Sequence, residues 1–333
     1  MILSIDYLWF KLFNTRGLGV KSLHKIYEML TIHNISIKEF FALEEKKANE
    51  LISPIARGKF SNISLDNIVN NEDPSVLSNY QKIKEDGFKI ITIESEEYPQ
   101  NVKNIMQDNA PIILFCKGYL PLLNTQGISI VGSRDVDEFA VLLTKSIASN
   151  LALSGYNVTS GYAKGVDTAA HIGALESQGT TTAILSYGVN FLSTRKELRR
   201  LDWERNTLFV TQFPHYEKFS GRNAMTRNKL VCAMSRAVVV ISSGPEKDFD
   251  GKMSGTYDAG KTALQMNLPL FVLSPVLFSK PPQGNMDLIK NGGIEIKNGN
   301  DIVDYLANKM FPIKEDFNKE QKTQSNSQIN LFD

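Results

Sequence analysis

The amino-acid sequence predicts an α/β fold, namely an extended Rossmann-like, mostly parallel doubly wound sheet with a small helical N-terminal domain. Short apolar segments recur from residue 128 onward, and helix-like segments separate most of them. Two of these segments end in glycine turns about thirty residues apart, which is the repeat of a strand-helix-strand unit. Before residue 75, apolar residues instead follow the spacing of helices.

Six strands are predicted for the main part of the sheet. In chain order they cover residues 128–131, 157–160, 181–185, 208–213, 237–242 and 270–273. Residues 76–120 carry two more strand-like segments around a short helix, and we expect them to extend the same sheet. Ligands of a doubly wound sheet lie beyond the carboxyl ends of its strands, so we expect the functional residues there.

This pattern divides the chain into three parts. Residues 1–75 are predicted to form a helical N-terminal domain of the helix-hairpin-helix or SAM-like type, because the turn Gly17-Leu18-Gly19 separates two helix-like segments. A tight turn in a small helical bundle explains the same glycines without any ligand. Residues 76–300 form the predicted extended Rossmann-like domain, and residues 301–333 a short helix followed by a flexible polar tail.

Composition points to a globular protein with a substantial core. Of the 333 residues, 42% are hydrophobic and 22% charged. No apolar run reaches the roughly 18 residues of a membrane span, and the N-terminus lacks the basic start of a secretory signal, so we expect a cytoplasmic protein without membrane contact. Cys116 and Cys232 stand alone in apolar segments, so we expect two core cysteines and no metal site.

The net charge of +1 conceals a basic segment. Between Arg195 and Arg236 the chain has ten Lys or Arg against four Asp or Glu, a local charge of +6. A localised basic segment in an otherwise slightly acidic chain is what a polyanion site requires, although most charged runs are solvated helix faces.

Glycine turns with nearby cations follow several of the predicted strands. Backbone amides at such turns attract phosphate, and Arg134 and Lys164 stand inside two of them. Arg222, Arg227 and Lys229 surround the start of a later helix, predicted to open at residue 226. The predicted DNA-binding and phosphate-binding residues are Gly132, Ser133, Arg134, Ser160, Gly161, Lys164, Arg222, Arg227, Asn228, Lys229, Ser254 and Gly255.

Asp167 and His171 receive a structural interpretation. Asp167 is predicted to cap the helix that follows it, and His171 to be buried and hydrogen-bonded one turn later. No Ser or Cys elbow accompanies them, so a catalytic role is less favoured. The turn after residue 131 lacks the G-x-G-x-x-G fingerprint, and no P-loop is present, so we expect neither a dinucleotide nor another cofactor.

The chain resembles the DNA-processing protein A (DprA/Smf) family over roughly residues 5–297. That resemblance implies a non-enzymatic, dimeric protein that binds single-stranded DNA without strong sequence preference, protects it, and loads a RecA-type recombinase during DNA uptake. It further implies that Arg134 contacts a phosphate with Lys164 beside it, and that Arg227 and Lys229 form the other wall of the groove. The motifs that carry it are Tyr98-Pro99, Val131-Gly132-Ser133-Arg134, Ser160-Gly161 through Asp167 with His171, Arg227-Asn228, and Ser254-Gly255-Thr256 with Ala259.

The chain departs from that family's pattern in several places. Ala224-Met225 replaces a Phe-Pro pair, which puts a base-stacking contact in doubt, and residues 189–193 lack a common Tyr-Pro pair. The insertion at residues 245–253 is longer than usual, and no winged-helix domain follows. These departures suggest a divergent member, for example in mobile-element or phage-defence biology.

A second class of function stays open. Related Rossmann-like proteins bind or hydrolyse nucleotide-derived small ligands, and their hydrolytic members carry the signature P-G-G-x-G-T-x-x-E. This chain has Ser254-Gly255-Thr256-Tyr257-Asp258 without the leading Pro-Gly-Gly. The absence weakens hydrolysis but leaves sensing of a small nucleotide ligand as the alternative.

The C-terminal tail carries a further motif. Gln328, Leu331 and Phe332 resemble the Q-x-x-L-F peptide by which bacterial replication and repair proteins dock on the sliding clamp of DNA polymerase. A polar tether ending in two large apolar residues fits such a docking peptide. The alternative is a tail whose Leu331 and Phe332 fold back onto the protein.

Overall fold

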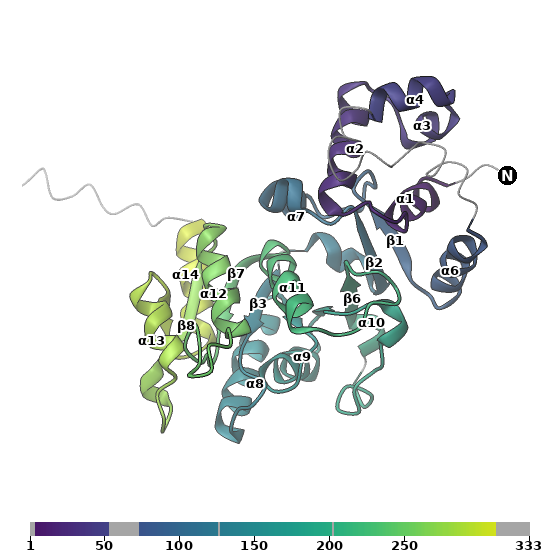
Figure 1. Ribbon diagram of the computed structural model, residues 1–333. Helices are drawn as coiled ribbons and strands as arrows, with labels where there is room; N and C mark the ends of the chain where they lie inside the picture. The colour runs from purple at the N-terminus through teal and green to yellow at the C-terminus, as the bar shows by residue number, and fades with distance from the viewer. Residues whose placement is uncertain (1–3, 53–72, 126, 202, 311–333) are drawn as a thin grey trace, which may run out of the picture.

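The computed structural model describes residues 4–52, 73–125, 127–201 and 203–310 (Figure 1). Their strands form one nine-stranded sheet in the order β1-β2-β6-β5-β4-β3-β7-β8-β9. The strands are β1 (Lys89–Thr92), β2 (Ile113–Gly118), β3 (Gly127–Val131), β4 (Asn157–Gly161), β5 (Thr181–Ile184), β6 (Thr207–Thr211), β7 (Ser235–Val240), β8 (Leu270–Leu273) and β9 (Ile294–Ile296).

The sheet is doubly wound around β3, as the sequence predicts. From β3 the chain proceeds through β4, β5 and β6 to one side and through β7, β8 and β9 to the other, and all these neighbours pair in parallel. The two strands expected from residues 76–120 do extend it, because β1 and β2 join the β6 edge antiparallel. The sequence analysis missed β9, since three residues are too short to show a period.

Alternation along β3 places helices on both faces of the sheet. Ile128 and Ile130 pack in a buried cluster with α8 (Glu138–Leu153), α9 (Val166–Glu176) and α14 (Gly299–Met310). Val131 faces the other way, toward α11 (Gly221–Ala233) and α12 (Gly255–Gln265). On that same face the Ser129 hydroxyl donates to the Val231 carbonyl at 2.9 Å. Cys116 and Cys232 are both buried, which confirms the expectation of core cysteines.

The N-terminal helices share a buried cluster with the sheet. Phe10 in α1 packs edge-on against Phe115 in β2, with ring centroids 6.2 Å apart. The turn around Gly17, whose φ is +92°, connects α1 to α2, and the boundary at residue 75 stays a prediction. The remaining helices are α1 (Ile5–Phe13), α2 (Val20–Ile32), α3 (Ile37–Ala42), α4 (Glu45–Ile52), α6 (Pro74–Glu85), α7 (Gln100–Met106), α10 (Trp203–Asn206) and α13 (Gln283–Lys290).

Helix α11 begins earlier than the sequence predicts. It starts at Gly221 rather than at Thr226, because the Ser220 hydroxyl accepts the Asn223 N–H at 3.1 Å and so caps the helix. Arg227 therefore lies in the middle of the helix rather than at its start, and its side chain is buried against Gly161 at the end of β4. None of the helices within the described ranges is long and apolar enough to cross a membrane.

Candidate functional site

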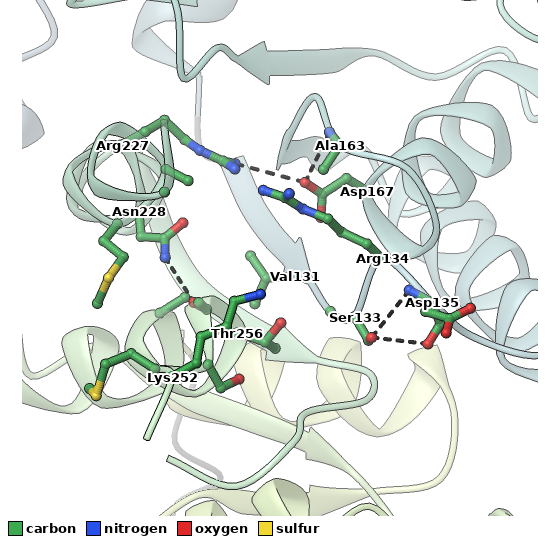
Figure 2. A pocket seen from close by; sticks show the side chains of 18 of the residues that line it. Val131, Ser133, Arg134, Asp135, Ala163, Asp167, Arg227, Asn228, Lys252 and Thr256 are labelled. Atoms are coloured by element: carbon green, nitrogen blue, oxygen red, sulfur yellow. Dashed lines mark hydrogen bonds and ion pairs between the residues drawn. The ribbon is translucent and has the colours of Figure 1, made fainter. Parts of the chain in front are cut away.

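A cavity of about 670 Å³ opens at the carboxyl ends of β3 and β7, where the winding of the sheet reverses (Figure 2). Ligands of doubly wound sheets bind at such a switch point. The cavity lies between the loop after β3 and the first turns of α9, α11 and α12. Among the residues that the sequence analysis selected, those lining it are Gly132, Ser133, Arg134, Asp167, Arg227, Asn228, Ser254 and Gly255.

The glycines after β3 and β4 are required because two turns interlock. A Cβ on Gly132 would stand 2.5 Å from Cγ2 of Val166, and Gly165, with φ +74°, lies against the Ser133 carbonyl. The Val166 N–H donates to the Ser133 carbonyl at 3.2 Å, and the Ser133 N–H donates to the Ser242 carbonyl at 2.9 Å. The Ser133 amide is thus already bonded, so it does not offer the free phosphate donor that the glycine turn suggested.

Arg227 forms the floor of the cavity rather than an exposed wall. Its guanidinium is buried and lies 3.8 Å from the Asp167 carboxylate. The guanidinium also rests on Gly161, because a Cβ there would overlap the Arg227 Nη1. Gly161 is therefore needed for Arg227, and not for close approach of a ligand.

Charge in the cavity is only partly balanced. Burial lowers the pKa of the Arg227 guanidinium and the Asp167 carboxylate raises it, but arginine titrates so far above neutrality that Arg227 stays charged. Its Nε has no hydrogen-bond partner among the described residues. Arg134 is close enough to repel this charge, and Figure 2 shows both guanidinium groups converging beside Asp167. An anion in the cavity relieves this repulsion.

Arg134 also carries an aromatic neighbour. Its guanidinium lies 5.0 Å from the ring centre of Phe219, a side chain about half exposed at the cavity rim. Phe219 was not among the residues predicted for the site, whereas Ala224-Met225 stand where the family has an aromatic residue. The signal that could have identified Phe219 is its place as a large aromatic residue within the polar stretch 217–222.

The first turn of α12 supplies backbone donors. Ser254 caps the helix, since its hydroxyl accepts the Tyr257 N–H at 3.3 Å, and the early amides of a helix lack partners within it. Asn228 holds this turn in place, because its amide donates to the Gly255 carbonyl at 2.8 Å and to Asp258 at 3.3 Å. Burial raises the pKa of Asp258, while the Asn228 hydrogen bond opposes that shift.

The prediction that Asp167 caps its helix is wrong. Helix α9 begins at Val166 with Gly165 as its N-cap, so Asp167 lies within the first turn. Its carboxylate accepts the Ala163 N–H at 3.3 Å and pairs with Arg227. His171 is buried, and its Nε2–H donates to the Gly161 carbonyl at 2.8 Å. Burial lowers the pKa of His171, which favours the neutral ring.

Several predicted site residues lie outside the cavity. Ser160 is fully buried and its hydroxyl donates to the Ile130 carbonyl at 2.6 Å, so its selection as a binding residue needs correction. Lys164, Arg222 and Lys229 are exposed on the surrounding loops and on α11, but they do not line the cavity. Lys252 lines it and was missed, because it belongs to the insertion at residues 245–253.

Metal-ligand groupings are absent from the part of the chain that the structure describes. No three His, Cys, Asp or Glu side chains there are placed to hold one ion.

Fold and site together define a Rossmann-like α/β protein with an arginine-lined cavity at the switch point of its sheet. The chain belongs to the family described as DNA recombination-mediator protein A, whose model matches residues 89–307. It is similar to the DNA processing protein DprA of Bacillus subtilis, at 26% identity over 246 residues, 73% of this chain and 79% of that protein. Protein Smf of Escherichia coli is also 26% identical, over 70% of this chain and 60% of its own length.

Two solved structures are similar to this chain. The X-ray structure of DprA from Streptococcus pneumoniae superposes with a TM-score of 0.72 at 22% identity, covering 91% of this chain and 98% of that one. DNA processing protein A from Helicobacter pylori, described for its single-stranded DNA binding mode, gives a TM-score of 0.54 at 26% identity, covering 67% and 97%. The first of these likenesses confirms the predicted fold.

Substituting Gly161→Ala tests the packing of Arg227. We expect the added methyl group to displace the guanidinium from Asp167 and to lower the free energy of unfolding by about 1–3 kcal/mol, because a close-packed site resists added volume. Gly221→Ala is the matched control, since a Cβ there meets nothing within 4 Å. Urea unfolding of both variants measures the difference. Equal stability of the two would contradict the described packing.

Proposed function

We propose that this chain is a single-stranded DNA-binding protein that protects the strand and transfers it to a RecA-type recombinase, with the cavity as its anchor for the DNA backbone. The observation that carries the proposal is the buried Arg227, whose Nε has no partner among the described residues, beneath the exposed Arg134. Support comes from the family's description as a recombination mediator and from the Helicobacter pylori relative described for single-stranded DNA binding.

A strand binds here through phosphate contacts and stacking. Arg134, Arg227 and the first turn of α12 surround a phosphate, while the half-exposed ring of Phe219 accepts a base. Exposed Lys164 and Lys229 extend the positive surface on either side of the cavity. Phosphate contacts and stacking read no base edges, so binding is expected to be tolerant of sequence.

We further propose that the site performs no turnover. Asp135 and Asp167 are the carboxylates that line the cavity among the described residues, and Asp167 is already paired with Arg227. Aligning Gly255-Thr256 with the hydrolase signature places Ala259 where that signature has Glu. Burial raises the pKa of the Cys232 thiol to about 12, so it is no nucleophile.

Sensing of a small nucleotide ligand is the alternative for the same cavity. A volume of about 670 Å³ lies within the range of small-molecule sites. A thermal-shift screen with nucleotides, followed by analysis of the same samples for hydrolysis, separates the possibilities. Stabilisation by a mononucleotide without binding of oligonucleotides would favour the sensor, and hydrolysis would overturn the non-enzymatic assignment.

Charge reversal at Arg134 tests DNA binding. We expect Arg134→Glu to weaken binding of oligo-dT and mixed-sequence strands alike, and to flatten the log-log salt dependence by about 0.7 per lost phosphate contact. Fluorescence anisotropy across a salt series measures both quantities. Lys290→Glu, which reverses an exposed charge on α13, is the control. Unchanged affinity and slope in Arg134→Glu would remove the cavity from the DNA-binding surface.

Recombinase loading is the second expected activity. On single strands already coated with a single-strand binding protein, the chain is expected to shorten the lag of the DNA-dependent ATPase of a RecA-type recombinase, and Arg134→Glu to lose this effect. An unaltered lag with wild-type chain would rule loading out and leave strand protection, which nuclease digestion measures.

Light scattering of the purified chain tests the proposed homodimer. Phage plaque counts on hosts with and without the chain test the proposed phage-defence setting.

Clamp docking rests on the tail alone, since Gln328, Leu331 and Phe332 lie outside the described residues. We expect weak binding to the cognate sliding clamp, because ordering a peptide offsets part of its contact energy. Calorimetry compares the full chain with the double variant Leu331→Ala, Phe332→Ala and with a chain ending at Ser327. Equal binding by all three would show that the tail does not dock.

A further inference from the structure

Residues 245–253, between β7 and α12, form a well-bonded hairpin beside the cavity. Lys247 and Met253 pair as an antiparallel bridge, and the Asp248 N–H donates to the Lys252 carbonyl at 3.0 Å. The Asp248 carboxylate lies within the turn, where it accepts the N–H groups of Asp250 at 3.0 Å and Lys252 at 2.8 Å. Gly251, with φ +75°, completes the turn.

The base of this hairpin is fixed to α12. Glu246 forms a 2.8 Å ion pair with Lys261, and its carbonyl accepts the Ser254 N–H at 3.0 Å. The base of the hairpin is therefore bonded to Ser254, the residue that caps α12 and lines the cavity. Its orientation relative to the phosphate site follows from these bonds.

Side chains at the base and at the tip of the hairpin are accessible to a ligand. Lys252 and Met253 line the cavity, and Figure 2 shows the Lys252 side chain reaching toward the space between Val131 and Asn228. Phe249, at the tip, is completely exposed. A fully exposed phenyl ring on a bonded turn gains nothing from the fold, since burial is what makes an aromatic ring favourable.

We propose that the hairpin is a second nucleotide-binding element of this site. Lys252 contacts a phosphate of the strand in the cavity, and Phe249 stacks on the base of a neighbouring unpaired nucleotide. Together with Phe219 at the rim of the cavity, Phe249 then gives the strand a second aromatic side chain on which a base stacks. This inference rests on the proposed DNA binding and adds to it a preference for unpaired bases.

The charges of the hairpin favour a base over a phosphate at the tip. Asp248 and Asp250 flank Phe249 and repel phosphate, whereas the ring offers a face on which any base stacks. Lys252, three residues on, supplies the cation where the cavity begins. In a duplex both faces of each internal base are covered by neighbours, so Phe249 has no partner there.

The test compares Phe249→Ala with Phe249→Trp in the full chain. For a dT oligonucleotide, we expect Phe249→Ala to raise the dissociation constant by about tenfold, within the range of a lost base stack, and Phe249→Trp to retain affinity. Binding should quench the fluorescence of the introduced indole relative to the wild-type titration. Leu153→Ala serves as the control, because it removes an exposed apolar side chain at the C-terminal end of α8, outside the cavity lining.

Duplex affinity and salt dependence complete the test. Affinity for a blunt duplex should be the same in wild type and Phe249→Ala, and Lys252→Gln should reduce the salt slope by about 0.7. Equal dT affinity of wild type and Phe249→Ala, as expected if the tip instead fits a pocket on a partner protein, overturns the inference. So does an equal loss on duplex, or an unquenched indole in Phe249→Trp. If wild type itself binds no DNA, the proposed function fails as well, whereas weakening by Arg134→Glu alone leaves that function intact.

Discussion

The buried contact of Arg227 with Gly161 and Asp167 is the constraint on which the arrangement of the site depends. It joins the end of β4, the first turn of α9 and the middle of α11. A charged group inside a protein is tolerated only when paired, so these three elements are fixed relative to one another. Asn228, the next residue along α11, then holds the first turn of α12. The arrangement of the cavity lining thus depends on one ion pair.

That ion pair leaves the cavity positive. Arg134, Arg227 and Lys252 line it against the two carboxylates Asp135 and Asp167. Arg227 also keeps an Nε without a partner among the described residues. Arginine suits this buried position better than lysine, because its charge persists on burial and its guanidinium fits against the bare backbone of Gly161. In the proposed function, a phosphate group of the bound strand supplies both a hydrogen-bond acceptor for this Nε and the balancing negative charge.

Sequence patterns predicted the sheet better than the site. Apolar segments located six strands to within about two residues, since each strand at the centre is buried on both faces. The burial of Arg227 was not predictable in the same way, because the groups that hold it, Asp167 and the backbone of Gly161, come from other parts of the chain. The requirement for glycine at positions 132 and 161 likewise arises from tertiary packing, since their neighbours Val166 and Arg227 come from other elements.

The aromatic residues of the site depend less on one particular sequence position than its ion pair does. Arg227 needs Asp167 opposite and a bare backbone at Gly161, so it has one possible position. A stacking ring needs only an exposed face within a nucleotide's reach of the phosphate anchor. Although Ala224-Met225 carries no aromatic ring, Phe219 stands half-exposed at the cavity rim and Phe249 is exposed at the tip of the 245–253 hairpin. The position of an exposed ring around the cavity is therefore less constrained by the fold than the position of Arg227.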